Sequence, residues 1–571
     1  MRKLTWPLAV AAIVATLAGC SPGSPGASDT TSTPAPTGAS GATATGPRFA
    51  VSFPASAHSA PITGRVFVFV TRNSEREPRL QINGYNGNIP YFGTDVSQLA
   101  PGQSAVVDAS TPGTVVDTLK DLPAGDYDVQ ALMNVYTRFP RADGHVIWAH
   151  MDQWEGQHFN VSPGNLVSAV RKVHLDPGQS QEIALSLDKV LPPVEVPQDT
   201  GWVKHVKFQS PMLTKFWGQP IFMGATILLP KGYAEHPDQH YPVVYVQGHF
   251  SLRPPYGFTD TPVKPDARSA ERRSVMGVET GYEFYQEWNS ADFPRMILVT
   301  FQTPTPYYDD SYTVNSVNSG PYGDAITQEL IPYVETHFRI IRKPGARMLT
   351  GGSTGGWESM NLMIKYPDLF GGTWSFYPDP LDFHHFQSVD AYNDANAFWA
   401  PGFGDWLRTP RYMSHRPDGQ PEVNFQQMSQ AEAVDGAHCR SGQQLCAFFA
   451  SWGPIGSDGY PVPLWDLRTG VIDKTAVDYA RDHGFDLTAY LQKNWPTLGP
   501  KLVDKIHVYV GDMDTYYLNL GVYDMQNFLQ ATRNPHYAGT FVYGRPEKPH
   551  GWNGGMTNAE LLRLIHKSVR P

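Results

Sequence analysis

The sequence predicts an α/β protein preceded by an all-β region, and changes of pattern along the chain predict both. Over 48–190, short apolar runs alternate with turns rich in Gly and Pro, which is typical of a β-sandwich. After a Pro-rich stretch at 190–197, fully apolar strands alternate with helical patterns, which indicates a mostly parallel sheet covered on both faces. We therefore expect a sandwich domain over 48–195 and an α/β domain over 196–571.

Turn residues mark the ends of the strands in the first region. The segments APGQ at 100–103, PAGD at 123–126 and DPGQ at 176–179 combine residues that favour tight turns. The strands expected around such turns are short and lie at 64–71, 105–107, 114–116, 127–133 and 182–187.

Strands and helices alternate in the second region. The expected strands lie at 224–229, 243–247, 296–301, 347–350, 372–376, 505–510 and 539–543. The expected helices lie at about 323–338, 356–366, 520–532 and 557–568. Thr557 and Glu560 are spaced as a capping box that opens the last helix, and Pro332 is expected to kink the first.

The start of the chain predicts export and lipid anchoring. A basic pair precedes an apolar run over 4–19, which is shorter than the roughly 20 residues of a membrane-spanning helix. The run ends in LAGC, which resembles the lipobox of bacterial lipoproteins, in which Cys20 is lipid-modified. The alternative is an ordinary signal peptide cleaved nearby. We expect a signal peptide over 1–20, a disordered tether over 21–47, and a lipid anchor in the bacterial cell envelope, at the outer membrane or cell surface.

The charge balance argues against one class of partner. The chain has 44 Lys and Arg against 54 Asp and Glu, a formal net charge of −10. Contacts with phosphates need a basic surface, so we expect no nucleic-acid partner. The sequence gives no indication of the oligomeric state.

Cysteine usage agrees with export. The chain has 3 cysteines, of which Cys439 and Cys446 follow the expected lipid-anchored one. In an oxidising compartment two cysteines this close in sequence are expected to form a disulfide that closes a small loop. Metal binding is the alternative, and only His438 lies beside them to support it.

The strongest catalytic motif is GGSTG at 351–355, a G-x-S-x-G. It stands between an expected strand and an expected helix, which is the setting of a nucleophile elbow, where flanking glycines let the backbone turn sharply and expose the serine. We predict that Ser353 is the nucleophile. Ser359 and Ser375 lack flanking glycines and are expected to be ordinary helix and strand residues.

A serine hydroxyl needs a base and an orienting carboxylate to attack an ester. In this arrangement the carboxylate and then the histidine follow later strands. The strand at 505–510 runs into GDMD, and the strand at 539–543 runs towards His550. We predict Asp514 as the carboxylate that fixes the tautomer of His550, which acts as general acid and base. Asp512 is the alternative carboxylate.

Four segments carry a family resemblance. They are YPVVYVQG at 241–248, GPYGDAITQELIPYVE at 320–335, the elbow, and the loops that hold Asp514 and His550. With these segments, residues from about 210 to 571 resemble the putative-esterase family of α/β hydrolases, which includes esterase D, feruloyl esterases, enterobactin esterases and mycolyltransferases. The resemblance implies an α/β-hydrolase fold and a serine esterase that needs no metal and no organic cofactor.

One departure from the family concerns the oxyanion hole. Members usually carry His-Gly at the end of the early strand, whereas here the order is Gln247-Gly-His249-Phe250. The resemblance and the mechanics of the elbow imply backbone donors from the Thr354 N–H and from the N–H of about His249 or Phe250.

An insertion over about 378–500 is expected to form a cap that shapes substrate entry, and an extra structural layer is the alternative. It is rich in aromatic residues, namely Phe383, Phe386, Trp399, Trp406, Trp452 and Trp465.

Metal sites are not expected. The pairs Asp309-Asp310 and Asp379 with Asp382 could bind calcium, but no regular loop of oxygen ligands is present. The adjacent His384 and His385 are expected to pack in the cap or lie at the surface, because neighbouring side chains diverge.

Together these residues predict an exported serine carboxylic-ester hydrolase that acts on a small-molecule or glycan ester. One alternative is an acyltransferase of the mycolyltransferase type, which passes the acyl group to a sugar or lipid alcohol. The other is a non-catalytic carbohydrate-binding protein of the envelope. A peptidase is a weaker reading, because the β region is too short for a propeller gate.

Overall fold

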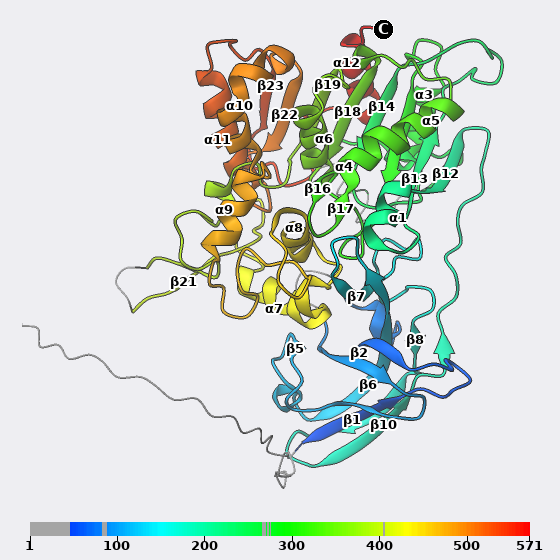
Figure 1. Ribbon diagram of the computed structural model, residues 1–571, viewed down its shortest axis with the longest axis vertical. Helices are drawn as coiled ribbons and strands as arrows, with labels where there is room; N and C mark the ends of the chain where they lie inside the picture. The colour runs from blue at the N-terminus through cyan, green and yellow to red at the C-terminus, as the bar shows by residue number, and fades with distance from the viewer. Residues whose placement is uncertain (1–45, 83–87, 265–269, 271–272, 274–275, 403–405) are drawn as a thin grey trace, which may run out of the picture. The chain divides into compact units, whose positions relative to one another are not determined.

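The computed structural model describes residues 46–571 except 83–87, 265–269, 271–272, 274–275 and 403–405 (Figure 1). The expected signal peptide, Cys20 and the tether up to residue 45 lie outside the described residues. Among the helices that the structure describes, none has both the length and the apolar composition to cross a membrane.

One mixed sheet forms the centre of the α/β region. In chain order its strands are β12 (Val203–Gln209), β13 (Phe222–Leu228), β14 (Val243–Gln247), β15 (Ile297–Gln302), β18 (Arg347–Gly352), β19 (Gly372–Phe376), β22 (Ile506–Gly511) and β23 (Thr540–Gly544). Their order in space is β12-β13-β15-β14-β18-β19-β22-β23. The pairs from β15–β14 to β22–β23 are parallel, and β13 is antiparallel to both of its neighbours. The predicted α/β class is confirmed.

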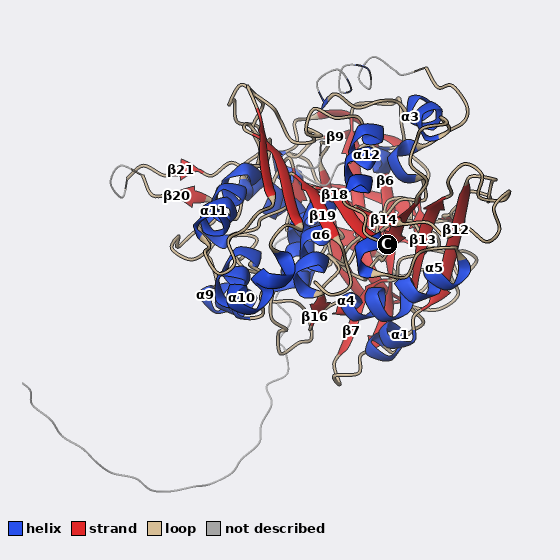
Figure 2. Cartoon of the chain, turned by 90° about the horizontal axis from the view of Figure 1, so that it is seen from above, coloured by secondary structure: helices blue, strands red, loops and turns tan. Residues whose placement is uncertain are grey.

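Helices cover both faces of this sheet (Figure 2). Side chains of β14 alternate between two apolar clusters, with Val243 and Tyr245 in one and Val244 in the other. The first cluster includes residues of α1 (Pro211–Trp217), α5 (Ile331–His337), α6 (Thr354–Lys365), α10 (Leu487–Leu502) and α11 (Leu518–Ala531). The second includes residues of α3 (Gly281–Trp288) and α12 (Asn558–Lys567). Burial on both faces explains the apolar runs in strands such as β14, whose sequence is VVYVQ.

Two elements differ from the sequence-based expectation. The edge strand β12 has the half-polar sequence VKHVKFQ, so no continuous apolar run marks it. The helix expected at 323–338 is interrupted: α4 (Tyr322–Ala325) is followed by a π-helical turn over Ile326–Leu330 and then by α5. Pro332 at the start of α5 has no N–H for the helical ladder, which explains an irregular turn at this point.

The first region is built of strands in two sheets. Its strands are β1 (Pro47–Ser52), β2 (Ile62–Thr71), β3 (Tyr91–Leu99), β4 (Ala105–Val107), β5 (Gly113–Thr114), β6 (Gly125–Pro140), β7 (Val146–His150), β8 (Leu166–Val167), β9 (Arg171–Leu175), β10 (Gln181–Ser186) and β11 (Lys189–Val190). One sheet has the order β11-β8-β6-β2-β3-β5, with β7 and β9 also paired to β6, and the other has the order β10-β1-β4. Residues of both sheets, such as Val51 and Val68, share one apolar core.

The insertion between β19 and β22 packs against this β-rich region. It contains α7 (Phe425–Asp435), α8 (Gln444–Trp452), α9 (Lys474–Asp482) and the short strands β20 (Trp399–Ala400) and β21 (Thr409–Pro410). The Tyr91 hydroxyl donates to Asp435 at 2.7 Å, and Arg65 Nε donates to the Val434 carbonyl at 2.8 Å. These buried contacts hold the C-terminal end of α7 against β2 and β3.

The expected disulfide is not present. Cys439 and Cys446 are both free and buried. Burial and the neighbouring Cys439 side chain raise the pKa of the Cys446 thiol well above its ordinary value. The prediction from spacing is therefore wrong for this structure: the two thiols pack in the core as small, unreactive side chains.

Candidate active site

The predicted nucleophile lies at a sharp turn between β18 and α6. Ser353 has φ 57° and ψ −124°, a conformation that non-glycine residues rarely adopt. The flanking glycines are required by close backbone contacts. A Cβ atom on Gly355 would lie 2.1 Å from the Gln247 carbonyl oxygen, and one on Gly351 would lie 2.4 Å from the Gly355 carbonyl oxygen. The G-x-S-x-G pattern therefore lets the elbow pack directly against β14.

This contact gives a first prediction. We expect Gly355→Ala to lower the free energy of unfolding by at least about 2 kcal/mol, because the added methyl group overlaps rigid backbone of β14. Urea unfolding followed by circular dichroism measures the effect. Gly248→Ala is the matched control, since a Cβ atom there meets nothing within 4 Å. Equal stability of the two variants would contradict the packing argument.

The predicted carboxylate and histidine are hydrogen-bonded to each other. Asp514 follows β22 and is fully buried, and its Oδ2 lies 2.9 Å from His550 Nδ1. Its Oδ1 accepts the backbone N–H of Tyr516 at 3.0 Å. The His550 ring packs edge-on against Tyr377 and Tyr516, with centroids 4.6 and 4.8 Å apart. Both position and tautomer of the imidazole are thus constrained.

Asp512, the alternative carboxylate, has a different environment. Its Oδ1 accepts the backbone N–H of Lys548 at 3.0 Å, and its own N–H donates to the Gly544 carbonyl at 3.0 Å. These bonds join the loop after β22 to the loop after β23. Asp512 therefore braces the loop that carries His550.

Tyr377 contacts both the elbow and the histidine. A Cβ atom on Gly352 would lie 2.4 Å from the Tyr377 hydroxyl, and the same ring packs on His550. Among the described residues, the Ser353 hydroxyl donates to Asp379 Oδ1 at 3.4 Å, and no hydrogen bond joins it to His550. Asp514 is thus hydrogen-bonded to His550, and Tyr377 contacts both His550 and the elbow.

Asp379 is a site residue that the sequence did not assign to catalysis. It follows β19 and is buried, and burial raises the pKa of its carboxyl group. Its Oδ2 accepts hydrogen bonds from the Tyr312 hydroxyl at 2.8 Å, from the Thr354 hydroxyl at 2.9 Å and from Gln444 Nε2 at 3.2 Å. Gln444 is the first residue of α8, so the insertion reaches the elbow through this carboxylate.

The segment expected to supply the upstream oxyanion donor follows β14. The Phe250 ring packs edge-on against Trp154, with centroids 5.3 Å apart, and a Cβ atom on Gly156 would lie 2.9 Å from the same ring. Trp154 and Gly156 belong to the loop after β7, so the β-rich region supports the segment that holds His249 and Phe250. Thr354, the other expected donor, is the first residue of α6.

A cavity of about 380 Å³ lies beside the elbow. Residues that are far apart in sequence line this cavity. They include Gly351 and Gly352 of the elbow, Tyr377, and Gly551, which follows His550. Apolar and aromatic side chains such as Met276 and Phe376 make up much of the remaining wall. Ser353 and His550 are not among the described residues that line this cavity, which adjoins the elbow through Gly351 and Gly352.

Comparisons with known proteins agree with this fold. Residues 222–443 match the family described as "Putative esterase", a segment that includes the elbow and the loop after β14 but ends before Asp514 and His550. The uncharacterized protein YbbA of Bacillus subtilis is 40% identical over 50 residues, which is 9% of this chain and 20% of that protein. The matched stretch therefore spans only a fifth of this curated relative.

Solved structures with a similar fold include a ferulic acid esterase, at 17% identity, with 65% of this chain and 98% of that chain covered and a TM-score of 0.32. An S-formylglutathione hydrolase from Agrobacterium tumefaciens is 11% identical, with 66% and 99% covered and a TM-score of 0.33. At these values neither structure bears on the substrate. The match of residues 222–443 to the family model comes from the sequence and does not depend on these two structures. Residues 222–443, which contain the elbow, are thus similar to the family described as "Putative esterase".

Proposed function

We propose that this protein is a serine carboxylic-ester hydrolase in which Ser353 is the nucleophile, His550 the general acid and base, and Asp514 the orienting carboxylate. One observation carries the proposal: the strained serine after β18 and the hydrogen-bonded His550–Asp514 pair come from loops at the same carboxyl edge of one sheet. The esterase-family match of the segment with the elbow supports the same class of reaction.

The acylation step begins when the Ser353 side chain turns from Asp379 towards His550 and gives its proton to the imidazole. The serine oxygen then attacks the ester carbonyl carbon, and the negative charge develops on the former carbonyl oxygen. Backbone N–H groups of Thr354 and of His249 or Phe250 stabilise this oxyanion, where one donor is worth about 10²–10³ in kcat. The protonated His550 donates to the leaving alcohol, and the acyl group remains on Ser353.

Deacylation repeats these steps with water as the nucleophile. His550 takes a proton from water, the resulting oxygen attacks the acyl-enzyme, and the imidazole returns the proton to Ser353 as the acid leaves. Asp514 holds the tautomer of His550 and stabilises the imidazolium in both halves of the reaction. The residues of this chain and one water molecule account for every proton transfer.

Product analysis distinguishes hydrolysis from acyl transfer. We expect p-nitrophenyl esters and acyl-sugar esters to give free acid as the main product, and added glycerol or trehalose to leave the yield of acid nearly unchanged. An acyltransferase would convert most of the acyl group into a new ester when the alcohol is present. A folded protein that turns over none of the aryl, feruloyl and acyl-sugar esters would overturn the proposal.

We also propose that the chain is exported and lipid-anchored through Cys20 in the bacterial cell envelope. The LAGC segment behind a short apolar run supports this proposal. Metabolic labelling with an alkyne fatty acid should modify the wild-type chain and leave Cys20→Ala unmodified. Equal labelling of both would contradict the anchor site.

A further inference from the structure

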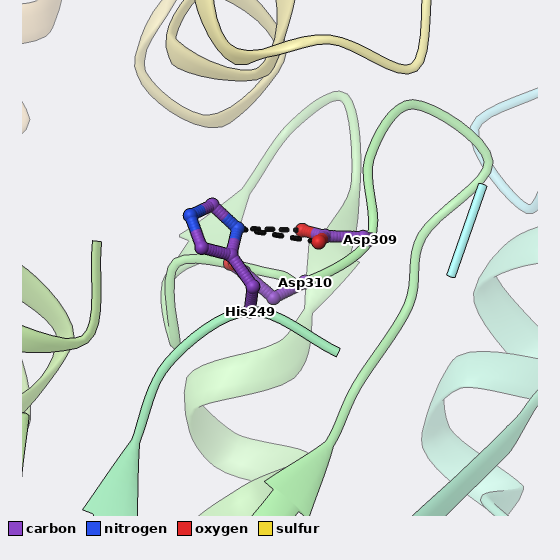
Figure 3. A group of neighbouring side chains, drawn as sticks. All are labelled: His249, Asp309 and Asp310. Atoms are coloured by element: carbon purple, nitrogen blue, oxygen red, sulfur yellow. Dashed lines mark hydrogen bonds and ion pairs between the residues drawn. The ribbon is translucent and has the colours of Figure 1, made fainter. Parts of the chain in front are cut away.

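A second group of polar side chains lies at the ends of β14 and β15. His249 follows β14, and Asp309 and Asp310 lie in the loop after β15 (Figure 3). Because these two strands are parallel neighbours, their carboxyl ends meet at one edge of the sheet. His249 Nδ1 lies 3.2 Å from Asp309 and 3.9 Å from Asp310 Oδ2, and the potential ligand atoms of the three residues lie within 4.8 Å of one another.

The Asp310 carboxylate has an unsatisfied oxygen. Asp310 is 3% exposed, and its Oδ1 accepts the Tyr312 backbone N–H at 2.7 Å. Its Oδ2 accepts no hydrogen bond from an N–H group or a hydroxyl group of the described residues, and it lies 3.9 Å from His249 Nδ1. The buried Glu358 carboxyl group also hydrogen-bonds the Asp310 carboxyl group. Burial of a carboxylate oxygen without such a donor is unfavourable, so a cation beside Asp310 Oδ2 would stabilise it.

One protein side chain pairs with these two carboxylates. Of the described Lys, Arg and His side chains, only His249 forms an ion pair with Asp309 or Asp310. Asp379 also lies close enough to His249 to act on it electrostatically. Three or more buried carboxyl groups around one imidazole are an environment in which a cation is strongly favoured.

We propose that His249 Nδ1, Asp309 and Asp310 Oδ2 bind one Zn²⁺ ion. One imidazole nitrogen and two carboxylate oxygens suit zinc, whereas calcium prefers oxygen ligands alone. Zinc ligands at 2.0–2.1 Å in a tetrahedron lie about 3.3 Å apart, and the atoms here lie 3.2 and 3.9 Å from His249 Nδ1. The His249 side chain is 47% exposed, which leaves a fourth position open to water.

The ion would join the loops after β14 and β15. His249 and Phe250 lie in the first of these loops, so zinc would fix the segment that holds the expected oxyanion donors. This is a structural role and is independent of the proposed ester hydrolysis. Its test therefore measures binding and stability.

The experiment uses the full-length, untagged protein together with its variants, all treated with EDTA and then dialysed. Calorimetric titration with zinc chloride is expected to give one site per chain and a rise of several degrees in melting temperature. We expect Asp310→Asn to weaken zinc binding about 100-fold or more, because one ligand is lost. His249→Gln, at a half-exposed position, should weaken it similarly and guards against a folding defect in the buried variant.

Asp382→Asn is the matched control. Asp382 is also buried and lies 2.9 Å from a histidine, His384 Nδ1, but among the described residues this pair belongs to no group of three side chains placed to hold a metal ion. It should bind zinc as the wild type does. If the wild type binds no zinc, or if Asp310→Asn and His249→Gln bind it as tightly as the wild type, the three residues form only an ion pair and the proposal is wrong.

Discussion

Replacing Ser353 by alanine is expected to lower kcat for p-nitrophenyl acetate by about 10⁶-fold. The alanine side chain cannot form the acyl-enzyme, so only the background reaction at the oxyanion donors remains. The fold should be unchanged, because the one hydrogen bond of the Ser353 hydroxyl within the described part of the chain is long, to Asp379 at 3.4 Å. Initial rates together with the circular dichroism spectrum measure both outcomes.

Ser359→Ala is the control for this variant. Ser359 lies in α6, which begins directly after Ser353, and is fully buried; among the described residues its hydroxyl donates to the Gly356 carbonyl at 2.8 Å. We expect it to retain most of its activity. Loss of activity in Ser359→Ala with retention in Ser353→Ala would show that the nucleophile has been wrongly assigned.

Replacing Asp514 by asparagine is expected to lower kcat by about 10⁴-fold. The amide group can donate a hydrogen bond to His550 Nδ1, which favours the tautomer in which Nε2 carries the proton and cannot accept one from serine. The backbone bond from Tyr516 to Oδ1 can persist, so the loop should stay in place. Steady-state rates over a pH series measure the loss.

Asp512→Asn separates the two candidate carboxylates. Its remaining carbonyl oxygen can still accept the Lys548 N–H, so we expect less than about a tenfold change in kcat. If Asp512→Asn lost as much activity as Asp514→Asn, the hydrogen bond between Asp514 and His550 would not explain the role of the carboxylate.

The sequence was sufficient to predict much of the central sheet, because inner strands such as β14 and β15 are buried on both faces and carry apolar runs. The strands β14 and β19 begin and end as predicted. The edge strand β12 was missed because one side of it is open and its sequence is half polar. The local sequence pattern thus predicts the strands that are covered by apolar side chains on both faces, and it misses an edge strand such as β12.

The sequence predicts those parts of the candidate site that are marked by a short motif of neighbouring residues. The glycines of the elbow are fixed by backbone contacts within a few residues and with β14, and GGSTG therefore marks it in the sequence. Asp379 and His249 carry no such signal. Their partners Gln444 and Asp309 are 65 and 60 residues away in sequence, and only the packing of neighbouring strands and the insertion brings them together.

The state of the cysteines shows a further limit of spacing. Cys439 and Cys446 are near neighbours in sequence, and the expectation of a bond rested on that and on export. In the structure the position of Cys446 is determined by α8, whose first N–H groups donate to the buried Glu432 at 2.8 Å. Helix geometry and burial thus decide the environment of the thiols.

Covalent labelling tests the central assignment most directly. The folded protein, incubated with a fluorophosphonate probe, should gain the mass of one adduct, and peptide mapping should find that adduct on Ser353. Ser353→Ala should gain none, and Asp514→Asn should react much more slowly. An unlabelled wild-type protein with a native circular dichroism spectrum, or an adduct on another serine, would contradict the account.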